Sequence, residues 1–198
     1  MIEKLHDITM IEELLKFDTD LFLFLNNLGS DPWDNLWRLI TNKLTFIPLY
    51  AFLLFLVYKS YGIKGMLVIM VCAALMITTA DQLANLFKHG LQRPRPCREE
   101  SLQEIMRFVV ERCGRYGYFS GHAINSMATA VFMGLLIKNK YYYLPFILLL
   151  WAFIVGYSRI YVGVHYPLDV LTGMFFGSII GWVFFRLQLI LNRKFAAN

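Results

Sequence analysis

The sequence predicts an all-α protein that lies in a membrane as a bundle of about five to six transmembrane helices. Of its 198 residues, 58% are hydrophobic and only 17% are charged, and the mean hydropathy of +0.51 is too high for an ordinary soluble domain. Several apolar stretches are also long enough to cross a hydrocarbon core about 30 Å thick, which takes about 20 helical residues. We therefore expect one membrane-embedded domain over residues 1–198.

The candidate spans are apolar stretches that begin after residue 43. They cover residues 44–58, 66–87, 127–137 with an extension back to 120, 143–157 and 170–191. Within the last stretch a glycine recurs at every fourth position, at Gly173, Gly177 and Gly181. This small-residue spacing lets two membrane helices approach closely, so we interpret it as a packing surface.

The N-terminal segment, residues 1–43, differs from these spans. Apolar residues alternate with charges at helical spacing over residues 2–16, which is the pattern of an amphipathic helix in the membrane interface; they are Leu5, Ile8, Ile11, Leu14 and Leu15. Residues 21–28 form a separate short apolar segment, which ends at a helix stop over residues 29–32 before a restart at Trp33. A sixth span would have to come from residues 19–42.

Lysine and arginine on short loops indicate the orientation, because they are enriched on the cytoplasmic side. With five alternating spans, the other side receives the N-terminus, the loop 89–119 and the turn 159–165. Residues 1–7 lack the features of a secretory signal, so we expect insertion through the spans themselves, in a bacterial inner membrane, with this second side facing the periplasm or the exterior. The side that we assign to the cytoplasm carries Lys59, Lys64, Lys138, Lys140, Arg193 and Lys194.

The loop 89–119 carries six arginines, against the orientation rule. We interpret some of them as ligands of an anion rather than as topology signals. The loop also holds Cys97 and Cys113, which can form a disulfide if the loop is extracytoplasmic; the alternative is two free thiols that share a loop. The third cysteine, Cys72, lies inside an apolar span and is expected to be a small buried hydrophobe.

The first of three clusters of ionisable residues lies at the end of the second span. Lys88 is followed seven residues later by Arg95, and on a continuous helix the two cations would share a face, although Pro94 and Pro96 predict a break. A lysine point charge and a planar arginine fork together suit a phosphate. The alternative is a membrane-edge cluster that binds anionic lipid headgroups.

The second cluster is Ser120-Gly121-His122, which stands where the loop enters the third span. The free N–H groups and the dipole of a helix start form an anion site. His122 would then face the same anion with an exchangeable proton. The alternative is an ordinary helix start with an interfacial histidine.

The third cluster is Ser158-Arg159, followed by His165 and Asp169. On a helix that begins at residues 166–167, Asp169 would hold one imidazole nitrogen of His165 and leave the other free to attack. The alternative is a structural histidine capped by an aspartate. All three clusters fall on the same predicted side of the membrane, and together they supply the cations, oriented donors, nucleophile and acid that phosphoryl transfer requires.

These residues resemble the type 2 phosphatidic acid phosphatases (PAP2), a family of membrane lipid phosphatases whose signature has three motifs. The motif KxxxxxxRP matches residues 88–96 and SRxxxxxHxxxD matches residues 158–169, both in full. The motif PSGH matches residues 119–122 except that Phe119 replaces the proline. Three motifs in this order are a specific signal. The resemblance covers about residues 44–191, with the catalytic motifs over residues 88–169.

The resemblance implies a mechanism in two steps that uses neither a metal nor another cofactor. His165 attacks phosphorus to form a phosphohistidine while His122 protonates the leaving oxygen, and an activated water then releases phosphate. Asp169 would orient His165. The phosphoryl oxygens would be held by Lys88, Arg95, Ser120, Gly121 and Arg159.

The lipid substrate stays open at this point among undecaprenyl pyrophosphate, phosphatidylglycerol phosphate, phosphatidic acid and lipid A phosphates. A lipid phosphotransferase would use the same site with another acceptor in place of water. A non-enzymatic alternative is a small transporter or scaffold whose basic loop binds anionic membrane lipids. The net charge of +5 lies at membrane edges rather than in a soluble basic domain, so nucleic acid is not an expected partner, and no protein partner is implied.

Overall fold

The computed structural model describes the backbone of residues 2–195 and the side chains of residues 9–194. These residues form α1 (Ile2–Asn27), α2 (Asp31–Thr41), α3 (Ile47–Leu91), α4 (Gly121–Ile137), α5 (Leu144–Tyr161) and α6 (Pro167–Phe195). Short 3₁₀ turns cover Lys43–Phe46, Pro96–Arg98 and Glu100–Leu102. The predicted all-α fold is confirmed, since the described chain has no strand beyond an isolated bridge between Pro94 and Tyr116.

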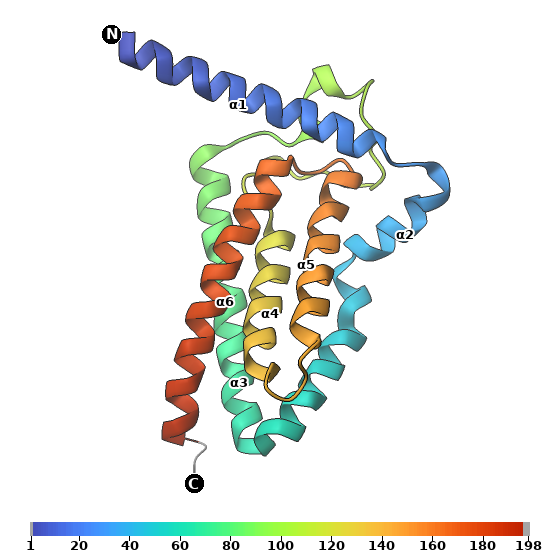
Figure 1. Cartoon of the computed structure of the whole chain (residues 1–198). Helices are drawn as coiled ribbons and strands as arrows, with labels where there is room; N and C mark the ends of the chain where they lie inside the picture. The colour runs from blue at the N-terminus through green and yellow to red at the C-terminus, as the bar shows by residue number, and fades with distance from the viewer. Residues whose placement is uncertain (1, 196–198) are drawn as a thin grey trace.

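The long helix α3 consists of two antiparallel limbs that meet at Gly62. Gly62 has φ 66° and ψ −174°, a backbone conformation that glycine adopts without steric strain. The chain reverses its direction there (Figure 1). The two limbs correspond to the predicted spans 44–58 and 66–87.

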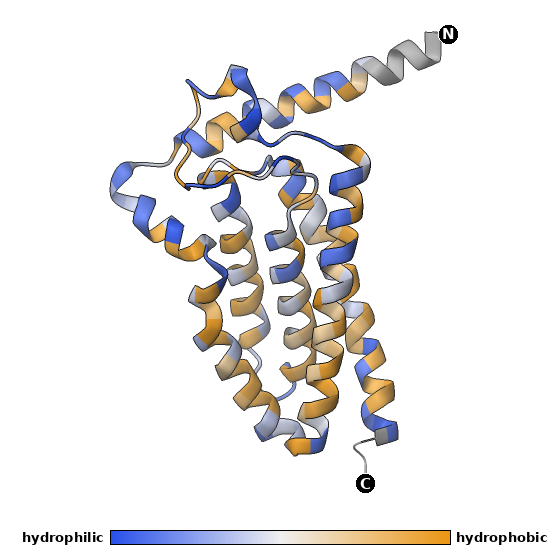
Figure 2. Ribbon diagram, turned by 180° about the vertical axis from the view of Figure 1, so that it is seen from behind, coloured by the Kyte–Doolittle hydropathy of each residue, from blue (hydrophilic) through white to orange (hydrophobic). Residues whose placement is uncertain are grey.

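Three stretches of the described chain are long and apolar enough to cross a membrane, namely Lys43–Leu91, Leu144–Tyr161 and Pro167–Lys194. Helix α4 is apolar as well but has only 17 residues. Figure 2 shows that hydrophobic residues dominate the bundle, whereas hydrophilic residues gather at its ends. The chain is therefore an integral membrane protein, and the division of the bundle into five spans stays a prediction.

Helix α1 is continuous and lies across one end of the bundle (Figure 1). The predicted separation of residues 2–16 from residues 21–28 is therefore wrong. The polar residues between these segments do not interrupt the helix. Asp18 is buried, with 2% of its surface exposed, and the Thr19 hydroxyl donates to the Leu15 carbonyl at 3.0 Å, so both side chains are accommodated within helical geometry.

The predicted helix stop after α1 is confirmed, because α1 ends at Asn27. Helix α2 begins at Asp31 rather than at Trp33, with Pro32 in its first turn, where a proline removes no helical hydrogen bond. Neither α1 nor α2 is among the described helices that are long and apolar enough to span a membrane, so no sixth span is found there. The side chains of Leu5 and Ile8 lie outside the described residues.

The connecting segments gather at the two ends of the bundle as the charge pattern predicts. At one end the Lys140 ammonium donates to the Lys59 carbonyl at 3.1 Å, and α6 ends there as well (Figure 1). The opposite end carries α1, the loop 92–120 and the turn 162–166 (Figure 1). We call it the arginine end. Which end faces the cytoplasm stays a prediction.

The central helix α4 packs against α6 at very short range, through the glycine stripe of α6. A Cβ atom added at Gly173, Gly177 or Gly181 would lie 2.8, 2.5 or 2.6 Å from a backbone carbonyl oxygen of this neighbouring segment. Such contacts are too short for any side chain. The predicted packing role of these glycines is confirmed, and it places the start of α4 beside the start of α6.

We expect Gly177→Ala to destabilise the fold by about 1–3 kcal/mol, because the added methyl group forces α4 and α6 apart. The measurement is the midpoint of thermal unfolding of the purified protein in detergent. Gly90→Ala is the matched control, because a Cβ atom at Gly90 meets nothing within 4 Å. Equal midpoints for the two variants would contradict the role of the stripe.

Candidate active site

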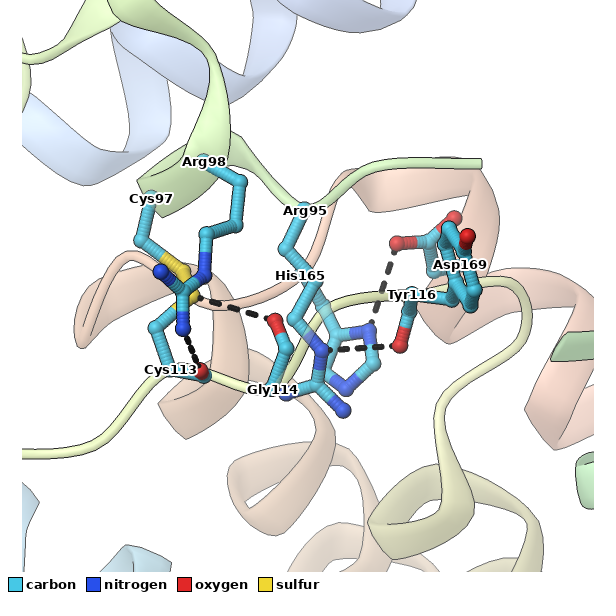
Figure 3. The surroundings of a disulfide bond; sticks show 8 residues. All are labelled: Arg95, Cys97, Arg98, Cys113, Gly114, Tyr116, His165 and Asp169. Carbon is cyan, nitrogen blue, oxygen red and sulfur yellow. Dashed lines mark hydrogen bonds and ion pairs between the residues drawn. A yellow bond between two sulfur atoms is a disulfide. The ribbon is translucent and has the colours of Figure 1, made fainter. Parts of the chain in front are cut away.

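His165 and Asp169 form a buried pair at the arginine end. His165 precedes α6, and Asp169 lies in the first turn of that helix. The imidazole Nδ1 lies 3.2 Å from Asp169 Oδ2 (Figure 3), and the same oxygen accepts the Tyr166 N–H at 3.1 Å. The Gly117 backbone also hydrogen-bonds the imidazole. The Asp169 carboxyl oxygen at Nδ1 is an acceptor, which favours the proton on Nδ1 and leaves Nε2 without it.

The environment of His165 keeps its imidazole neutral. Only 2% of the residue is exposed, and this burial lowers its pKa well below the ordinary value, with further lowering by the charges of Arg95, Arg159 and Lys88. Burial penalises the charged form, and like charges add to that penalty. A neutral imidazole with a free nitrogen is the form that can act as a nucleophile.

The three cations predicted from the motifs, Lys88, Arg95 and Arg159, lie around this pair and come from three different elements. The structure does not place Lys88 and Arg95 on one helical face, because α3 ends at Leu91 and the chain turns at Gln92, which has φ 49°. Instead the loop brings Arg95 back, and its Nε donates to the Tyr116 carbonyl at 2.9 Å. Helix geometry alone does not predict that the loop after α3 carries Arg95 back to the site.

The other two cations, Lys88 and Arg159, lie in the last turns of α3 and α5. A Cβ atom added at Gly121 would lie 3.5 Å from Lys88 Nζ, so the ammonium sits beside the start of α4. Arg159, in the last turn of α5, donates from Nη1 to Thr41 Oγ1. Its Nε is buried and has no partner among the described residues, which leaves one donor for a ligand.

The second motif forms the start of α4. Ser120 is the N-cap, and its Oγ accepts the Ala123 N–H at 3.4 Å, while its own N–H donates to the Asp169 carbonyl at 2.9 Å. His122 lies in the first turn and hydrogen-bonds the Thr41 backbone. Phe119, which replaces the proline of the motif, is fully buried and stacks on Phe176 at a centroid distance of 5.4 Å.

The structure joins Cys97 and Cys113 in a disulfide, with their Cα atoms 6.3 Å apart (Figure 3). Arg98 Nη2 also donates to the Cys113 carbonyl at 2.7 Å. The bridge closes the part of the loop that lies between Arg95 and Tyr116. It therefore fixes the two segments that hold the Arg95 side chain, whereas Cys72 stays a free, buried thiol, as predicted.

Two residues of the site were not predicted from the sequence, Arg93 and Asp18. Arg93 Nη1 lies 3.1 Å from Asp169 Oδ1, and its Nη2 lies 2.6 Å from Asp18 Oδ2. The guanidinium also covers the Tyr166 ring at 4.1 Å from the centroid, and Asp18 Oδ1 accepts the Leu168 N–H at 2.8 Å. One arginine thus joins α1 to the carboxyl group that faces His165.

Gly117 is a third residue that the motifs do not mark. A Cβ atom added there would lie 3.1 Å from both Arg95 Cγ and Asp169 Oδ2, and 3.6 Å from His165 Nδ1. The chain passes so close to the pair that a side chain would press on it. The sequence offers no pattern that would single out this glycine among the 13 of the chain.

All the site residues predicted from the three motifs therefore meet at one end of the bundle. A tetrahedral oxyanion placed there would meet cations, a helix N-terminus and a neutral imidazole. This combination binds and attacks phosphorus in an ester or anhydride. Fold and site together define a membrane protein of the phosphoryl-transfer class.

Comparisons with known proteins agree with this class. The model of the PAP2 superfamily matches residues 67–193. The lipid A 4'-phosphatase of Bacteroides thetaiotaomicron is 37% identical over 179 residues, which cover 89% of this chain and 79% of the relative. The lipid A 4'-phosphatase of Porphyromonas gingivalis is 33% identical over 184 residues, with 90% and 76% covered.

A solved structure shows the same fold. The transmembrane PAP2 type phosphatidylglycerolphosphate phosphatase from Bacillus subtilis superposes with a TM-score of 0.69 at 19% sequence identity, and the match covers 92% of this chain and 87% of that one. At this identity the likeness concerns the fold alone. The family model covers more than half of the chain, so this chain belongs to the PAP2 superfamily.

We expect the double variant Cys97→Ser/Cys113→Ser to raise the KM for a lipid phosphate about three- to tenfold, because the loop that carries Arg95 loses its crosslink. The measurement is phosphate release as a function of substrate concentration. Cys72→Ala, which keeps the bridge, is the control. Reductant should raise the KM of the wild type and of Cys72→Ala but not that of the double variant. An unchanged KM would show that the bridge does not hold Arg95 in place.

We expect Arg93→Gln to lower kcat about 10- to 100-fold with little change in KM, because Asp169 loses its second anchor and the imidazole loses its fixed orientation. Asp18→Asn should also lower kcat. The combined variant Arg93→Gln/Asp18→Asn should lose less activation free energy than the two single variants together, because both act through the same contact. Arg112→Gln, at an exposed arginine of the same loop, is the control. Additive effects of the two substitutions would contradict the idea that Asp18 acts on the site through Arg93.

Proposed function

We propose that this protein hydrolyses a phosphate monoester of lipid A, or of a closely similar phosphorylated glycolipid. The reaction is supported by the buried His165–Asp169 pair, whose imidazole is neutral and carries its proton on the nitrogen that faces the carboxyl group. The substrate is supported by the two relatives named lipid A 4'-phosphatase, which match about nine tenths of the chain. Of the candidate lipids, lipid A phosphate is the one that these relatives favour.

In the first step His165 Nε2 attacks phosphorus, a P–N bond forms and the P–O bond to the lipid breaks. His122 gives its proton to the departing lipid oxygen, which leaves as an alcohol. The imidazole of His165 becomes positively charged during attack. Asp169 offsets that charge through the Nδ1–H bond, and it holds the ring in the tautomer that can attack.

In the second step His122 takes a proton from water, whose oxygen displaces the phosphoryl group from His165. Inorganic phosphate leaves and both histidines return to their starting states. Three cations, Lys88, Arg95 and Arg159, stabilise the charge on the equatorial oxygens in both steps. The N–H groups at the start of α4, next to Ser120 and Gly121, add to this stabilisation.

We also propose that the arginine end faces the periplasm or exterior of a bacterial inner membrane. Two observations support this side. The lysine-rich loops gather at the opposite end of the bundle, as the positive-inside rule requires for a cytoplasmic side. The disulfide between Cys97 and Cys113 lies at the arginine end, and an oxidising compartment favours such a bond.

The test is phosphate release from purified lipid A phosphate by the protein in detergent. We expect the wild type to release phosphate, His165→Ala to fall to the background and His122→Ala to lose about 10²–10⁴-fold. His89→Ala is the matched control, because His89 is exposed at the end of α3 and should keep full activity.

Equal release by the wild type and both variants would contradict the proposed chemistry. A phosphorylated acceptor in place of free phosphate would identify a phosphotransferase with the same site. Release of phosphate from phosphatidic acid but none from lipid A would contradict the proposed substrate, whereas the proposed hydrolysis of a lipid phosphate would stand.

A further inference from the structure

A cavity of about 430 Å³ runs from His122 into the membrane bundle. Its wall comes from the end of α2, the 3₁₀ turn before α3, both limbs of α3, and helices α4 and α5. Most of the lining is apolar, including Leu53, Met76 and Phe132. The cavity reaches the site through His122, the proposed proton donor to the leaving lipid oxygen. The part of the lipid next to that oxygen would enter the cavity, where polar groups of the lining can select it.

Two polar residues, Asp81 and Asn125, lie in this lining below the phosphate level. Asp81 precedes Lys88 by seven residues on α3, about 10 Å along the helix, and Asn125 follows His122 by three residues on α4, about 5 Å deeper. Asn125 Nδ2 donates to Asp81 Oδ1 at 2.7 Å. The pair joins α3 to α4 at a depth where polar side chains are costly and are functional by default.

This hydrogen bond fixes the direction of the amide. If the Asn125 amide were flipped, two acceptor oxygens would face each other, so the NH₂ group must point to Asp81 and Oδ1 must point away. Oδ1 is buried and has no partner among the described residues. The second carboxyl oxygen of Asp81 is a further acceptor. The pair therefore offers two acceptor oxygens to a ligand, Asn125 Oδ1 and the second carboxyl oxygen of Asp81.

We propose that Asp81 and Asn125 form a subsite that recognises hydroxyl or amide N–H groups of the lipid next to its phosphate. A phosphorylated, acylated amino sugar carries such donors within reach of its phosphate. The glycerol esters of phosphatidic acid and the chain of a polyprenyl phosphate carry none. The subsite thus selects glycolipid phosphates, and the inference rests on the proposed function.

A second fully buried polar atom of the lining does not discriminate in the same way. Trp151 Nε1 is buried without a partner among the described residues, and it lines the same cavity. An indole N–H is a donor only. An acyl carbonyl can accept it, and both glycolipids and glycerol lipids carry acyl carbonyls, so the choice between the two classes falls to Asp81 and Asn125.

The test compares kcat/KM for lipid A phosphorylated at the 4' position with kcat/KM for dioleoyl phosphatidic acid in the same detergent. We expect Asp81→Asn and Asn125→Ser each to lower the lipid A value at least about tenfold, mainly through KM, because a site built for a hydroxyl group loses its partner. The phosphatidic acid value should stay within about threefold of the wild type. Asp20→Asn, the same chemical change at an exposed position of α1, should alter neither value.

An equal fall on both substrates in both variants would assign the pair to the fold and overturn the subsite. An unchanged lipid A value would overturn it as well. Failure of the proposed function gives a different result, because the wild type itself would then release no phosphate from lipid A. A selective loss on lipid A with retained hydrolysis of phosphatidic acid is the outcome that supports the subsite.

Discussion

The arginine end of the molecule depends on the fully buried carboxyl group of Asp169. Such a group must be hydrogen-bonded on both oxygens or it destabilises the fold. Its Oδ2 meets His165 and the Tyr166 N–H, its Oδ1 meets Arg93, and its backbone carbonyl accepts the Ser120 N–H. The starts of α4 and α6, the turn before α6 and the loop after α3 are therefore fixed relative to one another by a single residue.

The link from this carboxyl group to α1 is positional rather than stabilising. Burial raises the pKa of Asp18 even though the Leu168 N–H and Arg93 act in the opposite direction. A buried ion pair of this kind is weak evidence for stability, because desolvation opposes the attraction between the charges. Its consequence is geometric. Helix α1, which lies across the end of the bundle, and the Asp169 carboxyl group share one guanidinium, so the helix and the site form one unit.

Much of the fold and of the site could be predicted from the sequence, because the relevant signals are local. The spans follow from apolar runs, the reversal in α3 falls between two of them, and the three motifs carry short spacings. Arg93 and Asp18 could not be found this way, since 75 residues separate them and 76 separate Arg93 from Asp169. The continuity of α1 was not predicted either, because its amphipathic part and its short apolar part differ in pattern, and the ion pair that buries Asp18 between them depends on a distant arginine.

Some buried polar atoms of the bundle lack a hydrogen-bond partner in the described part of the chain, unlike the carboxyl group of Asp169. Among the described residues, Arg159 Nε, Asn125 Oδ1 and Trp151 Nε1 are buried without a partner and lie at the site or along the cavity that leaves it. Gln188 and Asn192, in the C-terminal half of α6, also carry such atoms but do not line this cavity. The carboxyl group of Asp169, by comparison, is saturated by the protein itself. At the site, a saturated group fixes geometry, whereas an unsatisfied one is available to a ligand. Donors thus lie near the phosphate position, acceptors lie below it, and apolar residues form most of the remaining lining. A phosphorylated glycolipid is complementary to this order, because its phosphate accepts hydrogen bonds, its sugar donates them and its acyl chains are apolar.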